Sequence, residues 1–113
     1  MEQVSTEVHN MHVAAKLFRA LDDPSRLVIL HHLLTGPHRV KDLVEHLSIS
    51  QSTVSQHLAV LKSNGLVQVR AEGRASVYSV TNPETLTALL ISAERLLAEN
   101  GQIVELCPEH SAS

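Results

Sequence analysis

Residues 48–61 read SISQSTVSQHLAVL, a short polar connection followed by a helical pattern. Val54, Leu58 and Leu61 recur at the spacing of one helix face, and Ser50 is a suitable capping residue before the first turn. The other face of this helix carries small hydroxyl and amide side chains with almost no charge. Lysine and glutamate are the stronger helix formers for a solvated face, and serine lowers helix stability, so this composition requires another explanation.

The segments around this helix predict a helix-turn-helix followed by a hairpin. A short helix with apolar positions at Val40, Leu43, Val44 and Leu47 precedes it, and Asn64-Gly65 is a suitable C-terminal stop. Residues 66–70 and 75–80 are strand-like and are separated by a turn at 71–74. We therefore expect a helix-turn-helix over 39–64 and a β-hairpin wing over 66–80.

Three further amphipathic helices flank this unit. Asp23-Pro24 and Asn82-Pro83 each place a capping side chain before a proline, which marks the start of a helix. Apolar residues at helical spacing predict a first helix over 6–21 and a second helix after Asp23-Pro24 that carries Leu27, Leu30, Leu33 and Leu34. They also predict a last helix over 83–100, followed by a tail over 101–113. The expected fold class is mainly α with a small β-hairpin, a single winged helix-turn-helix domain over 1–113.

Length and composition limit the class of protein. The 113 residues suit one domain, and 43% apolar with 19% charged residues is an ordinary globular balance. No apolar run approaches the roughly 18 residues that cross a bilayer, and the N-terminal residues do not resemble a secretion signal. A single cysteine, Cys107, excludes an intrachain disulfide and a four-cysteine zinc site within one chain. We expect a cytoplasmic protein without a membrane partner.

The charge distribution is uneven. The net charge is −3, yet residues 39–78 carry five basic against three acidic side chains, and residues 79–113 carry one basic against five acidic ones. The middle of the chain is therefore suited to face phosphates, and the acidic end is suited to lie elsewhere. An ordinary solvated surface explains so small a basic excess equally well.

Two interpretations of the polar helix face stay open on composition alone: a neutral surface helix, or a helix that reads the major groove. Short hydroxyls and an amide can approach base edges closely, and Gln56 could pair with adenine. Arg74 in a glycine-containing turn favours the second interpretation because a wing tip there can reach the DNA backbone or the minor groove. The candidate contacts to double-stranded DNA are Gln51, Ser52, Thr53, Ser55, Gln56, His57, Lys62, Arg70 and Arg74.

Three runs together resemble the ArsR/SmtB family of winged-helix regulators. They are ALDDPSR at 20–26, SQSTVSQHLAVL at 50–61, and Gly73-Arg74 with VYSV at 77–80, and the resemblance covers roughly residues 12–98. It implies a bacterial transcriptional repressor that dimerises through its first and last helices and binds an inverted-repeat operator. Many members of this family respond to metals.

The sequence departs from two metal sites of that family. A Cys-Val-Cys-Asp-Leu run is matched here by RVKDL at 39–43, so both thiolates are replaced by cations. A site on the last helix is matched approximately by Asn82, Glu84, Arg95 and Ala98, of which only Glu84 could coordinate. The remaining candidates are at the ends of the chain, where imidazoles with a thiolate would suit Ni²⁺ or Zn²⁺: His9, His12, Cys107 and His110. One cysteine per chain does not fit arsenite.

Other interpretations stay open. A metal-independent regulator of the same family could respond to a partner protein or another ligand, and the last helix could bind a heteropartner as well as a second copy. A thiol-redox sensor would use Cys107 but lacks a second cysteine to resolve the oxidised one. We expect no enzyme, because the sequence contains no phosphate-binding loop, nucleophile motif or pair of catalytic carboxylates.

Overall fold

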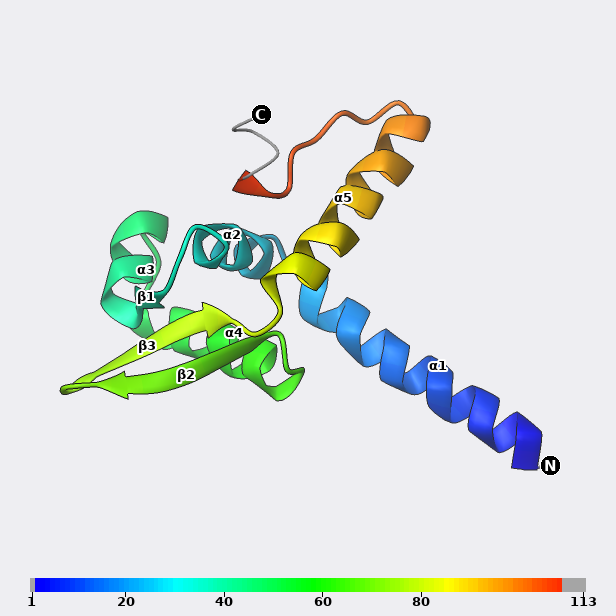
Figure 1. Cartoon of the computed structure of the whole chain (residues 1–113), viewed down its shortest axis with the longest axis horizontal. Helices are drawn as coiled ribbons and strands as arrows, with labels where there is room; N and C mark the ends of the chain where they lie inside the picture. Colours follow the sequence, from blue (N-terminus) through cyan, green and yellow to red (C-terminus); the bar gives the residue numbers. More distant parts are fainter. Residues whose placement is uncertain (1, 109–113) are drawn as a thin grey trace.

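The computed structural model describes the backbone of residues 2–108 and the side chains from Ser5 (Figure 1). The described chain is mainly helical with a small sheet, as the periodicity predicted. Its elements are α1 (Glu2–Leu21), α2 (Pro24–Leu33), β1 (His38–Arg39), α3 (Val40–Leu47), α4 (Gln51–Ser63), β2 (Val67–Glu72), β3 (Ala75–Val80) and α5 (Pro83–Glu99).

Only one of the two expected capping side chains caps its helix. Asp23 Oδ1 accepts the backbone N–H of Ser25 at 2.8 Å and that of Arg26 at 3.2 Å, and Pro24 occupies the first turn of α2. The hydrogen bond from the Arg26 backbone is the largest cause of a lowered pKa of the Asp23 carboxyl. Asn82 makes no side-chain hydrogen bond to α5, so the expectation of a cap there was wrong. Its backbone does not adopt the extended conformation that brings a capping side chain over the first turn.

The turn between α3 and α4 depends on Ser48. This residue has a left-handed backbone with φ of 56°, and its N–H donates to Val44 O at 2.9 Å, which ends α3. Ser50 then caps α4, because its Oγ accepts the backbone N–H of Thr53 at 3.2 Å. The expected helix-turn-helix is therefore present, with α3 and α4 inside the range 39–64.

The wing belongs to a three-stranded antiparallel sheet rather than an isolated hairpin. The strand order is β1-β3-β2, with Val67 opposite Val80 in the hairpin and His38 opposite Tyr78 at the edge. The hairpin is also longer than expected, because Ala71 and Glu72 pair in β2 instead of forming the turn. The sequence did not predict β1, since two residues are too few to show a strand period.

The core lies where α2, α3 and α4 meet the sheet and the first half of α5. Its buried residues are Ile29, Leu30, Leu33, Leu43, Val54, Leu58, Leu61, Val67, Val80, Leu86, Leu90 and Cys107. Except for Cys107, these residues lie in helices and strands of the body. Burial of this apolar set fixes α4 against the body by one face only.

Helix α1 projects from this body (Figure 1). The radius of gyration is 15.7 Å, compared with about 13 Å for a compact chain of about 100 residues. Apolar side chains on the projecting helix are exposed, among them Val8, Met11, Val13 and Phe18. Within residues 2–108, no helix combines the length and apolarity needed to span a membrane.

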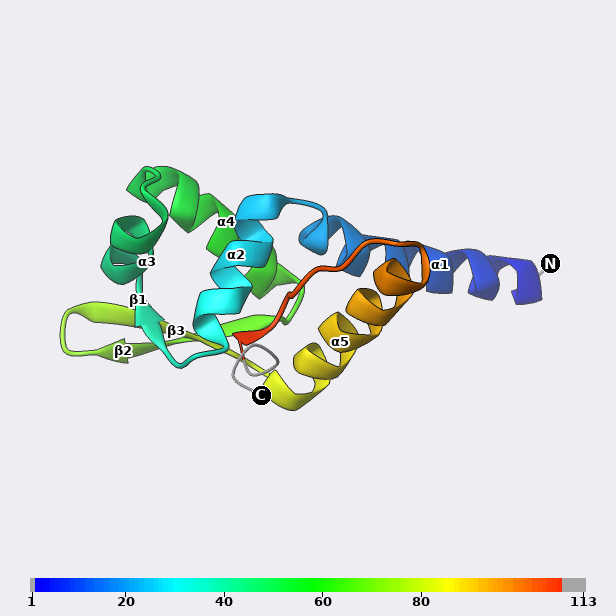
Figure 2. The same ribbon diagram turned by 90° about the horizontal axis from the view of Figure 1, so that it is seen from above.

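After α5 the chain turns back towards α2 (Figure 2). The N–H of Leu106 donates to Glu94 Oε2 at 2.6 Å, and the Cys107 thiol donates to the same oxygen with the sulfur at 3.7 Å. Glu94 is 5% exposed and Cys107 is fully buried in the core. The segment 102–108 is called the return segment below. Its first residues, 102–105, are exposed, and its end at Leu106 and Cys107 is docked on the body and contributes to the core.

Candidate nucleic-acid interface

Helix α4 presents a continuous polar face. Gln51, Ser52, Ser55 and Gln56 are exposed, while the apolar positions of the same helix are buried. Thr53 and His57 lie at the border and are half-buried. The division into a buried face and an uncharged polar face agrees with the sequence pattern.

Hydroxyl groups at the first turn of α4 bond to one another. Ser50 Oγ donates to Thr53 Oγ1 at 2.8 Å and lies 3.2 Å from Ser52 Oγ. The Thr53 side chain is therefore held by the helix cap. Ser52, Ser55 and Gln56 carry the exposed groups with the reach to approach base edges.

Cationic side chains lie on the wing and at the end of α4. Arg74 is exposed at the hairpin tip beside Gly73, whose φ of 64° allows the tight turn. Arg70 pairs with Glu72 at 3.2 Å, and both side chains are more than half exposed. Such an exposed pair contributes about 0–1 kcal/mol, so a phosphate can replace Glu72 as the partner of Arg70. Lys62 is exposed in the last turn of α4.

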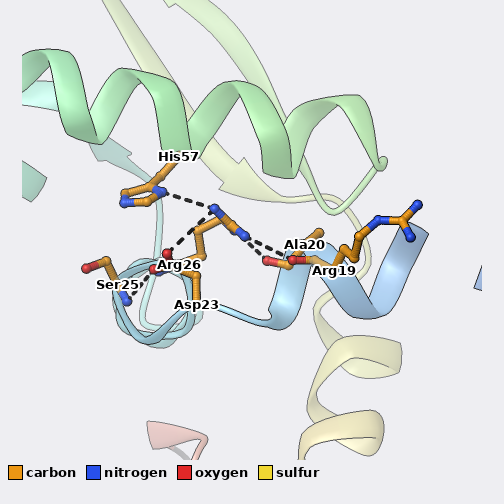
Figure 3. A network of polar contacts seen from close by, with 6 residues as sticks. All are labelled: Arg19, Ala20, Asp23, Ser25, Arg26 and His57. Atoms are coloured by element: carbon orange, nitrogen blue, oxygen red, sulfur yellow. Dashed lines mark hydrogen bonds and ion pairs between the residues drawn. The ribbon is translucent and has the colours of Figure 1, made fainter. Parts of the chain in front are cut away.

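Arg26 is a site residue that the sequence analysis did not single out (Figure 3). Its Nε donates to Ala20 O at 2.7 Å, its Nη2 donates to Arg19 O at 2.9 Å, and its Nη1 lies 3.3 Å from His57 Nδ1. Its Nη1 also lies 3.8 Å from Asp23 Oδ2. One guanidinium thus bonds to the end of α1, the start of α2 and the middle of α4. No signal in the sequence links positions 26 and 57.

Histidines distant in the sequence gather beside α3. The ring centroids of His32 and His46 are 5.1 Å apart, and His38 lies 5.8 Å from His46 and 6.3 Å from His32. Burial is the main cause of a lowered pKa of His32, and the neighbouring imidazoles lower it further. The three side chains come from α2, β1 and α3, and the packing of these elements brings them together.

The structure does not bring the terminal metal candidates together within one chain. His9 and His12 are exposed on the projecting half of α1, whereas Cys107 is buried in the body with its thiol on Glu94. The projecting half of α1 and the end of the return segment lie well apart in both views (Figures 1 and 2). His110 lies outside the described residues. Within residues 2–108, no three histidine, cysteine or acidic side chains are arranged to hold a metal ion.

Comparison with known proteins agrees with this geometry. The family model described as bacterial regulatory protein, arsR family, matches residues 23–69. A probable mercury resistance operon repressor of Streptomyces lividans is 40% identical over 93 residues, which are 82% of this chain and 74% of that protein. The chain belongs to the arsR family of bacterial regulatory proteins.

The proteins that this chain resembles include a probable repressor, an activator and a homodimeric DNA-binding domain. The transcriptional activator HlyU of Vibrio cholerae is 36% identical over 89 residues, covering 79% of this chain and 82% of HlyU. A homodimeric winged helix-turn-helix DNA-binding domain from Mycobacterium bovis superposes with a TM-score of 0.69 at 29% identity, covering 77% of this chain and 82% of that one. These comparisons confirm the winged helix-turn-helix fold class. Members of the family are transcriptional regulators, which are not enzymes.

Proposed function

We propose that this ArsR-family protein is a dimeric transcriptional repressor that binds an inverted-repeat operator in a sequence-specific manner. The observation that carries the proposal is the exposed, uncharged polar face of α4, which lies on the same domain as the cations of the wing. In this proposal α4 enters the major groove, where Ser52, Ser55 and Gln56 contact base edges. Lys62, Arg70 and Arg74 contact phosphates. Since a bacterial operator lies in the cytoplasm, the protein would act there.

The apolar surface of α1 supports a homodimer. A groove of about 610 Å³ opens between α1, α2 and α5, and its lining includes Phe18, Leu89 and Leu106. The exposed side chains of the projecting half of α1 provide matching apolar surface, and a two-fold dimer would use each surface twice. The relative from M. bovis is homodimeric. A two-fold dimer places its two recognition helices about one turn of DNA apart, which explains the choice of an inverted repeat.

We further propose a divalent transition metal, Ni²⁺ or Zn²⁺, as the effector. The mercury resistance relative supports a metal as the class of effector, and the imidazoles of His9 and His12 suit these two ions. His9 and His12 are three residues apart on α1 and therefore project from one side of it. Because the structure separates them from the buried Cys107, a site that includes Cys107 would need a second protomer and release of the return segment.

Fluorescence anisotropy tests the DNA proposal. The protein is titrated onto a labelled fragment of its own promoter and onto a scrambled fragment of the same length, each at several salt concentrations. We expect at least about 10³-fold preference for the promoter. We expect Arg74→Ala to reduce the slope of log affinity against log salt by about one, whereas Arg95→Ala on the acidic α5 leaves it unchanged. Equal affinity for both fragments would contradict the proposal.

The effector is tested with the same promoter fragment, first with chelator and then with Ni²⁺ or Zn²⁺. A fall in affinity on metal addition that disappears when His9, His12, Cys107 and His110 are all replaced by alanine would support the metal site. Metal-sensitive binding that survives these substitutions would contradict the site. Binding that metal does not change would favour a partner protein or another ligand as the effector, and a 12.4 kDa monomer in solution would favour a heteropartner.

A further inference from the structure

The contact between Arg26 and His57 fixes the protonation pattern of the imidazole. A guanidinium is always a donor, so His57 Nδ1, 3.3 Å from Arg26 Nη1, must accept. The imidazole is then neutral with its proton on Nε2. Figure 3 shows that the other ring nitrogen points away from Arg26. Asp23 lies beside the same guanidinium, with its Oδ2 3.8 Å from Arg26 Nη1.

The other two bonds of Arg26 anchor it to α1. The carbonyls of Arg19 and Ala20 belong to the last turn of α1, where helical carbonyls lack partners within the helix and the helix dipole is negative. Arg26 therefore closes the C-terminal end of α1 with two hydrogen bonds. The side chain is 16% exposed, so solvent screens these contacts only in part.

We infer that Arg26 is a positioning residue that sets the orientation of the recognition helix α4 relative to the dimerisation helix α1, through its bonds to the α1 carbonyls and to His57. This inference rests on the proposed function, since it assumes that α4 reads DNA and α1 forms the dimer. In a two-fold dimer, the angle between α1 and α4 within each protomer determines the distance between the two α4 helices. The bonds of Arg26 to the α1 carbonyls and to His57, called the Arg26 bridge or the bridge below, thus select the spacing of the operator half-sites.

The decisive variant is Arg26→Gln, assayed on the promoter fragment and on the same fragment with one base pair inserted between the half-sites. The insertion moves one half-site by about 3.4 Å and turns it by about a tenth of a helical turn. We expect the wild-type protein to lose about tenfold or more in affinity on the longer DNA. We expect Arg26→Gln to bind the native fragment more weakly and to discriminate between the two fragments by less than about threefold.

Three controls separate positioning from stability. Arg19→Gln removes the same charge, but its carbonyl still accepts from Arg26, so this variant should behave as wild type. Arg26→Lys should resemble Arg26→Gln, because an ammonium cannot reproduce the fork that reaches two carbonyls and an imidazole. The double variant Arg26→Gln/His57→Leu should discriminate between the two DNA fragments no less than Arg26→Gln alone, because the single variant has already lost the contact between these two side chains. Thermal unfolding confirms that each variant is folded at the assay temperature.

An NMR measurement tests the bridge without DNA. Long-range proton–nitrogen correlation of the imidazoles in the free protein should show His57 as the Nε2–H tautomer, and Arg26→Gln should change that pattern. Observation of the Nδ1–H tautomer in the wild type would overturn the bridge. An equal loss of affinity of Arg26→Gln on both DNA fragments would overturn the positioning role. If the wild type bound no promoter DNA, the proposed function would fail and the role in spacing with it, while the tautomer would still show whether the bridge exists.

Discussion

Ser50 and Ser52 lie two residues apart but differ in what they do for α4. Ser50 Oγ accepts the backbone N–H of Thr53 and so satisfies one of the donors at the helix start, whereas Ser52 is exposed on the polar face. We predict that Ser50→Ala lowers the free energy of unfolding by about 1 kcal/mol. Ser52→Ala should change it by less than about 0.5 kcal/mol. Urea denaturation followed by circular dichroism measures both, and equal effects of the two substitutions would contradict this assignment.

Cys107 is the second residue whose environment gives a direct prediction. Its thiol is fully buried and donates to Glu94, so a thiol reagent can reach it only when the return segment opens. We predict slow labelling of the native protein and immediate labelling in denaturant. Glu94→Ala removes the acceptor of the Leu106 N–H and should accelerate native labelling about tenfold or more, whereas Glu94→Gln, which keeps an acceptor oxygen, should accelerate it less. Immediate labelling of the native wild type would show that the return segment is not docked, and would restore the redox interpretation of Cys107.

At the scale of elements, sequence periodicity and capping residues predicted the positions of the longer amphipathic helices. The apolar repeat at Val54, Leu58 and Leu61 placed α4, and Asp23-Pro24 placed the start of α2. Short or irregular segments were not predictable, because their structure depends on tertiary contacts. Strand β1 exists because it pairs with β3, and the return segment is held by a buried carboxylate rather than by a repeat.

The candidate site likewise has features that the sequence predicts and features that only tertiary packing creates. The polar face of α4 and the exposed Arg74 follow from local pattern and turn chemistry. The Arg26–His57 contact and the histidine cluster join residues from separate elements, and only the packing of those elements brings them together.

The histidine cluster beside α3 predicts a loss of stability in mild acid. The pKa of His32 is lower in the folded state than in the unfolded chain. Below about pH 6.5 the imidazole is therefore protonated more readily in the unfolded chain, and this favours unfolding. The contribution of neutral His32 to stability is thus complete above pH 6.5 and is lost as the pH falls towards the lower pKa of the folded state. Thermal unfolding between pH 7.5 and 5 should show a steeper decline for wild type than for His32→Gln.

The control for this prediction is His9→Gln, which changes an exposed histidine on α1 and should leave the pH dependence as in wild type. An identical pH dependence of wild type and His32→Gln would show that His32 does not contribute to the acid sensitivity.

At the scale of the whole molecule, the projecting α1 exposes apolar side chains that a second protomer would cover in the proposed dimer. Met11 is 62% exposed, so Met11→Asp should leave the folded chain intact but place a charge in the proposed dimer interface. We predict that light scattering after gel filtration gives twice the 12.4 kDa chain mass for wild type and a single chain mass for Met11→Asp. Val60→Asp, an exposed apolar position on α4, should remain dimeric. A monomeric wild type at micromolar concentration would contradict the homodimer.

Reading of bases by α4 underlies the proposed function, and a base-pair scan of the operator with wild type and Gln56→Ala measures it. Each base pair of one half-site is substituted in turn and the affinity is measured by anisotropy at constant salt. We predict that wild type loses about 1–3 kcal/mol at an A·T pair that faces Gln56. Gln56→Ala should lose its preference at that pair alone and keep its preference at the others. Identical base preferences of the two proteins at every position would contradict the assignment of Gln56 to base reading. A wild type without any base preference would contradict base reading by α4 altogether.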